Sequence, residues 1–333
     1  MIMANVGNEF FREQLLERRE RLAVVVARTG PAAELARLTQ EVDAALDRLE
    51  QGSFGLCDVC HESVEKDRLI ADPLARFCLD HLDARQQQAL SEDLQLAARL
   101  QKALLPAQDL RIGGWQAHYR YEPAGAVSGD YCDLIACEGD SGGFFFLLGD
   151  VSGKGVAASM RMNQLHAMFR SLIRVDQPLE RLVEIANNIF CRSGISGQYA
   201  TLVCGEAARS GEVELASAGH LPALHVGCGG VAHLEATGFP LGMFCDSRYE
   251  VHRLRLEPGE SLLLYTDGVT EMRDAAQKEF GVRRLADLAR ASRTLEPQGL
   301  AAACIDGLKS FSAGTQRSDD LTMLVLRRSA PPA

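Results

Sequence analysis

Long hydrophobic runs are missing from this chain. No window approaches the roughly 18 apolar residues of a membrane-spanning helix, and the first residues, Met1 to Asn5, lack signal-peptide architecture. Positive charge is also scarce, because 35 Lys and Arg stand against 45 Asp and Glu, for a net charge of −10. This balance argues against bulk affinity for nucleic acid, although a local basic patch remains compatible with it. We expect a cytoplasmic protein.

A cysteine spacing of the kind that builds a disulfide framework is absent as well. Ten cysteines are scattered along 333 residues, apart from one cluster, and this pattern indicates reduced intracellular thiols. A phosphate-binding loop that starts at Cys and ends in Arg is also lacking, so Cys132 is interpreted as a core residue and not as a nucleophile. The apolar content of 47% supports a real core, and the length suits two or three domains.

The first hundred residues are dominated by helical patterns. Residues 8–51 predict a helical hairpin, because apolar residues recur at helical spacing on both sides of Thr29-Gly30-Pro31. Residues 82–105 predict a further amphipathic helix, which Pro106 ends. Its apolar stripe consists of Leu90, Leu94, Ala97, Leu100 and Leu104.

Between these helices the chain carries a cysteine and histidine cluster. Cys57 and Cys60 are followed, after seventeen intervening residues, by Cys78 and His81. Two close pairs of thiolate and imidazole ligands match a closed tetrahedral zinc site, which we expect to be structural. Asp80 and His61 are weaker substitutes for the fourth ligand.

Acidic residues recur at the edges of predicted strands: Asp130, Asp150, Asp267, Asp319 and Asp320. One of them, Asp150, lies in a glycine-rich turn between a predicted strand and a predicted helix, which by itself fits an ordinary tight turn as well as it fits a metal or phosphate site. Carboxylates repeated at strand ends predict an oxygen-ligand site for hard divalent cations. Two metals that share one aspartate would fit such a set.

The region that carries these aspartates alternates short strands with helices. We expect strands at 115–121, 131–136, 143–149, 199–206, 212–217, 222–226, 249–256, 260–266 and 321–327. We expect helices at 156–174, 178–194, 281–291 and 297–310. Short strands joined by turns, with helices in pairs, are compatible with two packed sheets that have helices outside.

Five motifs carry a resemblance to a known family. In chain order they are SGDYCD, GDVSGKG, ASAGHLPAL, YTDGVTE and RSDDLT. This set resembles the metal-dependent, PPM-type serine/threonine phosphatases, and in particular their SpoIIE/RsbU-like branch, over about residues 90 to 330. The resemblance implies an α+β fold, an α-β-β-α sandwich.

The resemblance also implies a site and a reaction. Asp130, Asp150, Asp267 and Asp319 match the family's metal ligands, with the Val151 carbonyl as a backbone ligand and Asp320 acting through a water. Two Mn²⁺ or Mg²⁺ ions would hold a bridging water that attacks phosphorus. The implied substrate is a phosphorylated STAS-type anti-sigma-factor antagonist in a bacterial partner-switching pathway.

Two further motif residues have alternative interpretations. His220 matches a family position and is more simply a hydrogen-bonded structural histidine than a general acid. Lys154 stands where relatives often have His. It could hold an anionic substrate, but a solvated lysine at the start of a helix is the slightly favoured interpretation.

The cysteine segment carries a second resemblance. CDVCHESVEKDRLIADPLARFCLDH resembles the DksA/TraR-type zinc finger, with His81 where that family usually has a fourth Cys. The alternative function this suggests is a regulator that binds RNA polymerase through the hairpin. That family needs acidic residues at the hairpin tip, where this chain has Ala27-Arg28-Thr29-Gly30-Pro31. A catalytically inactive scaffold is a third possibility, against which the intact aspartate set argues.

We therefore expect four segments. They are a helical hairpin (1–54), a zinc finger (55–82), a linker helix (83–106) and a phosphatase domain (107–330). The sequence LQKALLP near the end of the linker helix resembles the linker that enters RsbU-like phosphatase domains. In that family such helices can pair as coiled coils, which predicts a homodimer through the linker and an upstream regulator acting on the N-terminal region.

Overall fold

The fold was analysed in a computed structural model, which describes residues 3–29, 33–82, 84–137, 142–175, 177–193, 197–313, 315 and 317–329. The chain divides into two compact units, Met1–Asp93 and Leu94–Ala333. Among the described residues, no helix has the length and apolar character needed to cross a membrane.

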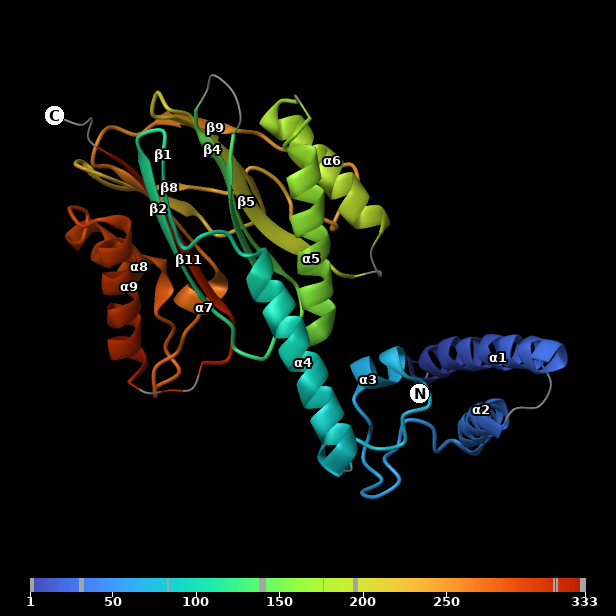
Figure 1. The fold of residues 1–333 in the computed structure, drawn as a ribbon. Helices are drawn as coiled ribbons and strands as arrows, with labels where there is room; N and C mark the ends of the chain where they lie inside the picture. The colour runs from blue at the N-terminus through green and yellow to red at the C-terminus, as the bar shows by residue number, and fades with distance from the viewer. Residues whose placement is uncertain are drawn as a thin grey trace. The chain divides into compact units, whose positions relative to one another are not determined.

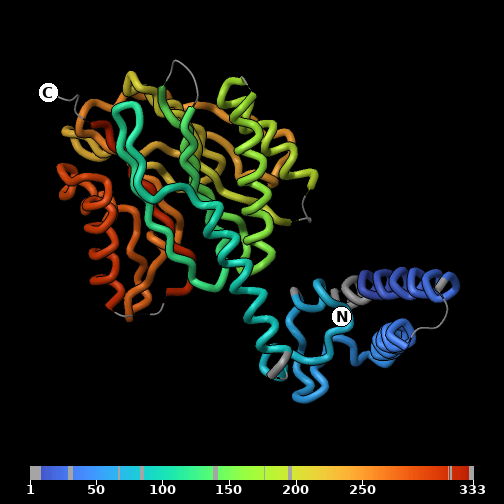
Figure 2. The backbone as a smooth tube through the Cα atoms, viewed as in Figure 1, coloured from blue at the N-terminus to red at the C-terminus, as the bar shows by residue number. Residues whose placement is uncertain are grey.

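The first unit is built on the predicted hairpin. Helices α1 (Met3–Thr29) and α2 (Ala33–Gln51) lie side by side, as the backbone trace shows (Figure 2). The Arg19 guanidinium lies 2.8 Å from the Asp43 carboxylate across the pair, and Leu15, Val42 and Ala45 form a buried core between the helices. Two residues of the predicted break, Gly30 and Pro31, lie outside the described residues.

The cysteine segment packs onto this hairpin. It contains the short helix α3 (Lys66–Ala71) and the 3₁₀ turn η1 (Leu79–His81). Phe11 of α1 belongs to the same buried cluster as Cys57 and Cys78, with Phe54 packed against it. The hairpin and the cysteine segment therefore share one hydrophobic core.

Helix α4 (Ala84–Leu104) confirms the linker helix predicted at 82–105. Its apolar stripe is covered only in part, since Leu90 and Leu100 are 38% and 61% exposed, whereas Leu94, Ala97 and Leu104 are half-buried. The side chain that α4 does bury is polar, because Gln101 is only 3% exposed. The helical spacing was thus predicted correctly, but it did not reveal which residue anchors the helix.

The second unit contains two antiparallel sheets. One has the order β1 (Asp109–Ile112), β2 (Trp115–Glu122), β11 (Leu321–Arg328), β10 (Ser261–Tyr265), β7 (Ala223–Gly227) and β8 (Gly230–Leu234). The other has the order β3 (Asp130–Ala136), β4 (Phe144–Val151), β5 (Ala200–Ala207), β6 (Glu212–Ala218) and β9 (His252–Arg255). The helices of this unit that follow α4 are, among the described residues, α5 (Gly155–Leu172), α6 (Leu179–Arg192), α7 (Asp267–Thr270), α8 (Gly281–Ala291) and α9 (Pro297–Ser312).

The sheets pack face to face, with α5 and α6 on one side and α8 and α9 on the other (Figure 1). Strand β4 shows why its sequence is apolar without interruption. Phe144, Phe146 and Leu148 point into the core between the sheets, whereas Phe145 and Leu147 point into the core under α5 and α6. A strand covered on both faces needs apolar residues at every position. The expected α-β-β-α sandwich is confirmed.

The edges of the sheets were predicted less well. Strands β1 and β8 were missed, and β9 is shorter than the predicted 249–256. These are edge strands whose side chains are partly or fully exposed, so they carry no clear apolar alternation. The short helix α7, directly after β10, was also missed.

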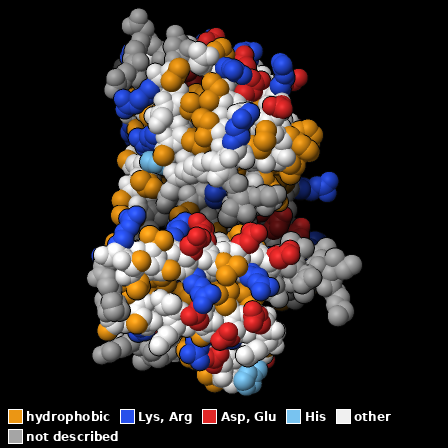
Figure 3. All heavy atoms as spheres, turned by 90° about the vertical axis from the view of Figure 1, so that its right-hand side faces the viewer, with side chains coloured by type: hydrophobic (Ala, Val, Ile, Leu, Met, Phe, Trp, Pro, Cys, Tyr) orange, Lys and Arg blue, Asp and Glu red, His pale blue; other side chains and the backbone are white. Residues whose placement is uncertain are grey.

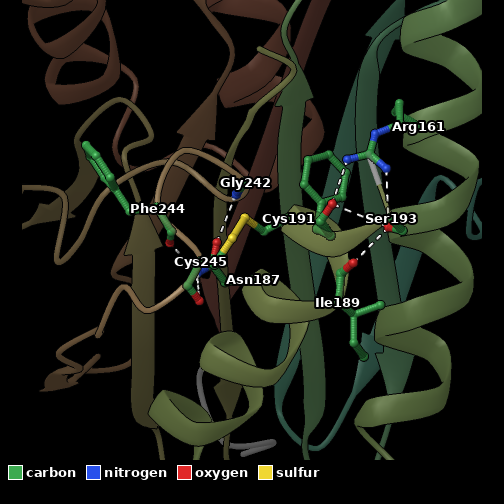
Figure 4. The surroundings of a disulfide bond; sticks show 9 residues. Arg161, Asn187, Ile189, Cys191, Ser193, Gly242, Phe244 and Cys245 are labelled. Carbon is green, nitrogen blue, oxygen red and sulfur yellow. Dashed lines mark hydrogen bonds between the residues drawn. A yellow bond between two sulfur atoms is a disulfide. The ribbon is translucent and has the colours of Figure 1, made fainter. Parts of the chain in front are cut away.

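One expectation about cysteines was wrong. Cys191, at the end of α6, forms a disulfide with Cys245, which lies 54 positions later, with the two Cα atoms 5.4 Å apart (Figure 4). The Asn187 side chain holds the same loop, because it donates to the Phe244 and Cys245 carbonyls and accepts from the Gly242 amide. Sequence spacing could not reveal this pair, since the fold alone brings the loop against α6. The other eight cysteines are free.

Candidate functional site

The pairing of β3 with β4 brings the first two aspartates together. In this register Asp130, the first residue of β3, lies directly opposite Asp150 near the end of β4. The Val151 amide donates to the Gly129 carbonyl at 3.2 Å, so the two strand ends are joined just where the acidic residues stand. Asp150 is partly buried, whereas the Asp130 side chain is almost completely enclosed.

The second sheet supplies the surroundings of Asp130. Thr266 follows β10 and Thr322 lies in β11, and both hydroxyls donate to Asp130 Oδ2, that of Thr266 at 2.9 Å. The two threonines are also joined to each other, since the Thr322 amide donates to Thr266 Oγ1 at 2.9 Å. Asp130 is therefore one of the points at which the two sheets are joined by hydrogen bonds. Asp267 directly follows Thr266, and Asp319 lies three residues before Thr322.

Asp320 holds the loop in front of β3. Its carboxylate accepts from the Ala124 amide at 2.7 Å and from the Gly129 amide at 2.9 Å. Both oxygens are used, so its direct contribution is to the backbone between β2 and β3. Asp319 accepts from the Asp320 amide at 3.0 Å, which fixes the orientation of the neighbouring carboxylate.

The carboxylates of this region repel one another. Burial, followed by repulsion from Asp267 and Asp319, raises the pKa of Asp150 to about 7. Burial and the charge of Asp319 raise the pKa of Asp267 to about 6. Burial and the charge of Asp150 likewise raise the pKa of Asp130 well above its usual range. A cluster with these properties has an unmet demand for positive charge.

Lys154 supplies part of that charge. Its ammonium lies 2.9 Å from Asp319 Oδ2 and donates to the Ser318 carbonyl at 2.8 Å. The hydrogen bond to Asp319 raises the pKa of Lys154. Lys154 is the N-cap residue of α5 and its side chain is 65% exposed, as expected for a solvated lysine at the start of a helix, and it also pairs with the acidic cluster.

His220 lies beneath the site and joins the two sheets. Its Nδ1 is 2.8 Å from the Thr201 hydroxyl, and Thr201 is paired in register with Asp150. Its Nε2 is 3.1 Å from the Tyr265 carbonyl at the end of β10. Burial lowers the pKa of His220 to about 4, so the imidazole is neutral, and both of its nitrogens are occupied. This arrangement supports the structural interpretation over a general acid.

The aspartates do not form a tight single-ion cage. Among the described residues, one group of three or more Cys, His, Asp or Glu has all its ligand atoms within 4.8 Å of one another, and it is Cys57, Cys60, Cys78 and His81. The aspartates are spread more widely across the sheet ends. Two cations about 3.5–4 Å apart require such a wider set. The mutual repulsion of the carboxylates and their burial are the properties that divalent cations would satisfy.

The cysteine cluster has the geometry of a closed site. Cys57 and Cys60 lie in a turn where the Cys57 amide donates to the Glu62 carbonyl. Cys78 directly precedes η1, and His81 is its last residue. The sulfurs of Cys60 and Cys78 are 3.9 Å apart, and Cys78 Sγ is 3.1 Å from His81 Nδ1. Tetrahedral ligands at zinc–sulfur bond length lie about 3.8 Å apart, so the thiols fit one zinc ion. His81, and neither Asp80 nor His61, completes the group.

Sequence reasoning missed the residues that support the aspartates. Thr266 and Thr322 could have been noticed as polar residues next to apolar strand segments that end beside an aspartate. Gln101 carried no signal, because a glutamine on a helix is usually a solvated residue.

Comparison with known proteins finds a matching family both for the cysteine segment and for the domain that carries the aspartates. Residues 140–329 match the family described as Stage II sporulation protein E (SpoIIE). Residues 52–80 match the prokaryotic dksA/traR C4-type zinc finger, so His81 lies one position beyond the match.

Relatives and solved structures extend the match. The chain is 28% identical over 274 residues to Protein IcfG of Synechocystis sp., covering 71% of this chain but 42% of IcfG. It is 29% identical over 257 residues to phosphoserine phosphatase RsbU of Bacillus subtilis, covering 73% of this chain and 72% of RsbU. The SiaA-PP2C domain of Pseudomonas aeruginosa covers 74% of this chain and 98% of its own, with TM-score 0.64 and 21% identity, and so shares the fold.

A structure of the RsbU and RsbW domains of a Mycobacterium tuberculosis protein is also similar. It is 28% identical to this chain with TM-score 0.57, and it covers 69% of this chain and 63% of its own. The SpoIIE match alone takes in more than half of the 333 residues. The chain therefore belongs to the SpoIIE family, and it shares its fold with the SiaA-PP2C domain.

Proposed function

We propose that this chain is a metal-dependent protein phosphatase that removes phosphate from phosphoserine or phosphothreonine. The observation that carries the proposal is the acidic cluster at the joined ends of the two sheets, where Asp150 and Asp267 have raised pKa values. Relatives of similar sequence, RsbU and RsbP of Bacillus subtilis, are named phosphoserine phosphatases, which supports the same reaction here.

The proposed ligands are the residues of this cluster. Asp150, Asp267 and Asp319, together with the Val151 carbonyl and Asp130, would hold two Mn²⁺ or Mg²⁺ ions, with Asp320 contributing through a water. Bound divalent cations supply Lewis acidity and activate water for attack on phosphorus.

The protein's own part in the reaction is positioning. Thr266 and Thr322 fix Asp130 from the second sheet. Asp320 fixes the backbone of Gly129, and Lys154 orients Asp319. Pre-oriented carboxylates lower the cost of binding cations and place them for in-line displacement at phosphorus, in which positioning and electrostatics are the main catalytic effects.

We further propose that the substrate is a phosphorylated STAS-type anti-sigma-factor antagonist in a partner-switching pathway. Resemblance to RsbU and to a protein that combines RsbU and RsbW domains supports this assignment. A protein substrate also suits the surface that carries α5 and α6, where hydrophobic side chains lie open to solvent (Figure 3). Val156 and Met160 on α5 are 51% and 67% exposed.

The N-terminal unit is proposed to hold one structural Zn²⁺ at Cys57, Cys60, Cys78 and His81, and to receive an upstream regulator. Pairing of two chains through the exposed stripe of α4 is proposed as the route to a homodimer. The zinc-finger match does not by itself favour the alternative of an RNA-polymerase-binding regulator, because the hairpin tip lacks the acidic residues that this function needs.

The test is dephosphorylation of phosphorylated STAS proteins encoded near this gene, with Mn²⁺ present and after chelation. We expect release of phosphate only with the cation. A small aryl phosphate serves as the comparison, because a site built for a protein should prefer the phosphoprotein. Turnover that persists unchanged after complete removal of divalent cations would contradict the metal-dependent mechanism.

A further inference from the structure

The first unit contains a cavity in which positive charge is concentrated. The cavity has a volume of about 470 Å³, and both the hairpin and the cysteine segment line it. Its described lining includes five arginines, which come from α1, α2, α3 and the chain after α3: Arg18, Arg37, Arg48, Arg68 and Arg76. The carboxylates in the same described lining are those of Glu41 and Asp72. In a chain with a net charge of −10, this excess of cations is a local feature that does not follow from composition.

Arg48 is a largely buried cation that lacks a full set of partners. Its side chain is 16% exposed, and its Nε is buried without a hydrogen-bond partner among the described residues. The Asp58 carboxylate lies 4.0 Å from Arg48 Nη1, but it accepts from Arg76 Nε at 2.6 Å. Burial lowers the pKa of Arg48, and the charge of Arg76 lowers it too, against the opposing effect of Asp58. A buried guanidinium in this position is stabilised when an anion reaches it.

Arg68 adds a second cation without a carboxylate partner. It is half-buried on α3, and it forms no ion pair with any residue that the structure describes. The cavity thus has two guanidinium groups whose charge the described carboxylates neutralise only weakly. A guanidinium offers paired N–H donors that match the oxygens of a phosphate group. A phosphate also brings about 1.5 to 2 negative charges at pH 7, more than a carboxylate does, so phosphate is the anion that this pair fits best.

Two further arginines of the cavity are held only loosely. Arg18 lies 3.8 Å from Asp72, and both side chains are about half exposed. Arg37 pairs with two glutamates of its own helix, where all the side chains involved are exposed. Exposed ion pairs contribute little to stability, so a ligand with more negative charge can replace a carboxylate partner. Arg18 and Arg37 therefore add to the positive charge available to a bound anion.

The rest of the described lining favours a small ligand. Leu74, Ala75 and Phe77 supply apolar surface from the cysteine segment, and Leu74 and Phe77 are half-buried. A concave site of about 300–1,000 Å³ that combines apolar surface with a few charged groups is typical of small-ligand binding. A long polymer of phosphates needs an extended basic surface, and the carboxylates of Glu41 and Asp72 interrupt it here.

We propose that this cavity binds a small organic molecule that carries two phosphate groups. Arg48 and Arg68, the two poorly neutralised cations, bind the phosphates, and Leu74 and Phe77 contact the uncharged part of the molecule. The inference concerns the first unit alone and does not depend on the proposed phosphatase reaction. It gives this unit a ligand besides the proposed zinc ion.

The test is a calorimetric titration of the full, zinc-containing chain with adenosine diphosphate (ADP), in buffer without added Mn²⁺ or Mg²⁺. The aspartate cluster is then negatively charged and repels the nucleotide, so it does not contribute to binding. We expect one ADP per chain with a dissociation constant in the micromolar range, and weaker binding of inorganic pyrophosphate, which lacks the uncharged part. Arg68→Met should raise the dissociation constant for ADP by about 10- to 100-fold, the effect of losing a hydrogen bond between charged groups.

Arg21→Met is the matched control. Arg21 also belongs to the first unit, on α1, but its side chain is 75% exposed and is not part of the described cavity lining. We expect its affinity for ADP to stay within about twofold of the wild type. Zinc content, measured before and after each titration, shows whether a variant has kept its fold. If Arg68→Met loses zinc, Arg68→Lys replaces it, because lysine keeps the charge without the planar fork and should still weaken binding.

The inference would be overturned by any of several results. Wild-type protein that binds neither ADP nor pyrophosphate has no such site. A loss in Arg21→Met as large as that in Arg68→Met would place the binding outside the cavity, and unchanged affinity in the folded Arg68 variant would do the same. An RNA or DNA oligonucleotide that binds far more tightly than ADP, and depends on Arg68, would make the cavity part of a nucleic-acid surface instead. None of these results bears on phosphatase activity, which is measured separately.

Discussion

The ligands of the cysteine cluster all lie between Cys57 and His81, whereas the aspartates of the second cluster extend from Asp130 to Asp320. The first cluster is assembled by a turn and a 3₁₀ segment within one small module. The second exists only after two sheets have packed, because Asp130 and Asp150 come from one sheet and the residues around Asp267 and Asp319 from the ends of the other.

The two clusters also differ in charge and support. The thiols and imidazole form a compact group whose ligand atoms lie within 4.8 Å of one another, as expected for one closed ion site. The aspartates repel one another and are held apart by hydrogen bonds from Thr266, Thr322 and backbone amides. A metal at the first site should therefore be needed for folding, and metals at the second should be needed for activity but not for folding. The predictions below test this difference.

The largest effect is expected from Asp150→Asn. The variant keeps the shape of the side chain and removes a charge that would hold both cations, so kcat/KM should fall by at least about 100-fold, or about 3 kcal/mol in transition-state stabilisation. The assay uses a phosphoprotein at saturating Mn²⁺, with Asp306→Asn on the exposed face of α9 as the control. Turnover near that of the wild type would refute the assignment of Asp150.

Loss of the ligands of the cysteine cluster should affect folding, whereas Asp150→Asn should affect catalysis. Replacing Cys57 and Cys60 with Ser should release one zinc ion per chain and unfold the cysteine segment, because small modules of this kind take their folding free energy from the ion. Elemental analysis and limited proteolysis of residues 52–82 measure both effects, with Cys228→Ser, at an exposed free thiol, as the control. Absence of zinc from wild-type protein purified without added metal would mean that the cluster consists only of buried thiols.

The disulfide lies in the second unit and should contribute to stability alone. It closes a loop of 54 residues, for which chain entropy predicts about 4 kcal/mol. Replacing Cys191 and Cys245 with Ala should lower the midpoint of denaturant unfolding of the oxidised protein while leaving Mn²⁺ affinity unchanged. The variant should also be insensitive to dithiothreitol, which should lower the stability of the wild type. Equal stability of both proteins under oxidising conditions would show that the bond does not contribute.

The pH dependence of the unfolding free energy tests the contact that His220 makes between the two sheets. Its pKa falls from 6.5 to about 4 in the folded chain, so the unfolded chain takes up more protons between these values. The stability contributed by the neutral imidazole is therefore present above pH 6.5 and lost as pH falls toward 4, by about 3 kcal/mol. We expect unfolding free energy to drop less over this range in His220→Gln. Protonation of the aspartates, whose pKa values are raised in the folded chain, stabilises the fold as the pH falls. This contribution is present in both proteins, so the difference between their pH profiles reports His220. Parallel pH profiles would contradict a buried neutral His220.

The smallest effect is expected from removing the first unit. A chain that begins at Leu94 keeps Gln101 but loses the hairpin, the cysteine segment and half of α4. Because a helix is stiff, we expect the N-terminal unit to influence the second unit through α4, and kcat/KM should change by more than about twofold. The full chain and the shortened chain are compared at equal Mn²⁺. A smaller difference would limit the N-terminal unit to localisation or partner binding.

Much of the architecture could be predicted from the sequence. Apolar runs such as Phe144 to Leu148 mark strands buried on both faces, and the helical spacing of apolar residues marks α2, α6 and α8 well. Edge strands β1 and β8 were missed because residues that are half exposed carry no strong pattern. The disulfide was missed because pairing depends on which segments meet, and spacing along the chain does not encode that.

The sequence by itself determined the site whose ligands lie close together along the chain. Cys57, Cys60, Cys78 and His81 are close in the chain, so their spacing alone predicts a site that the structure assembles from the same four residues. The aspartates could be named from motifs, but their surroundings depended on the tertiary structure. Only the packing of two sheets places Thr266 and Thr322 on Asp130, turns Lys154 toward Asp319 and buries Gln101 against Ser128. The physical reason is that hydrogen bonds and repulsion act over a few ångströms in space, irrespective of separation in the chain.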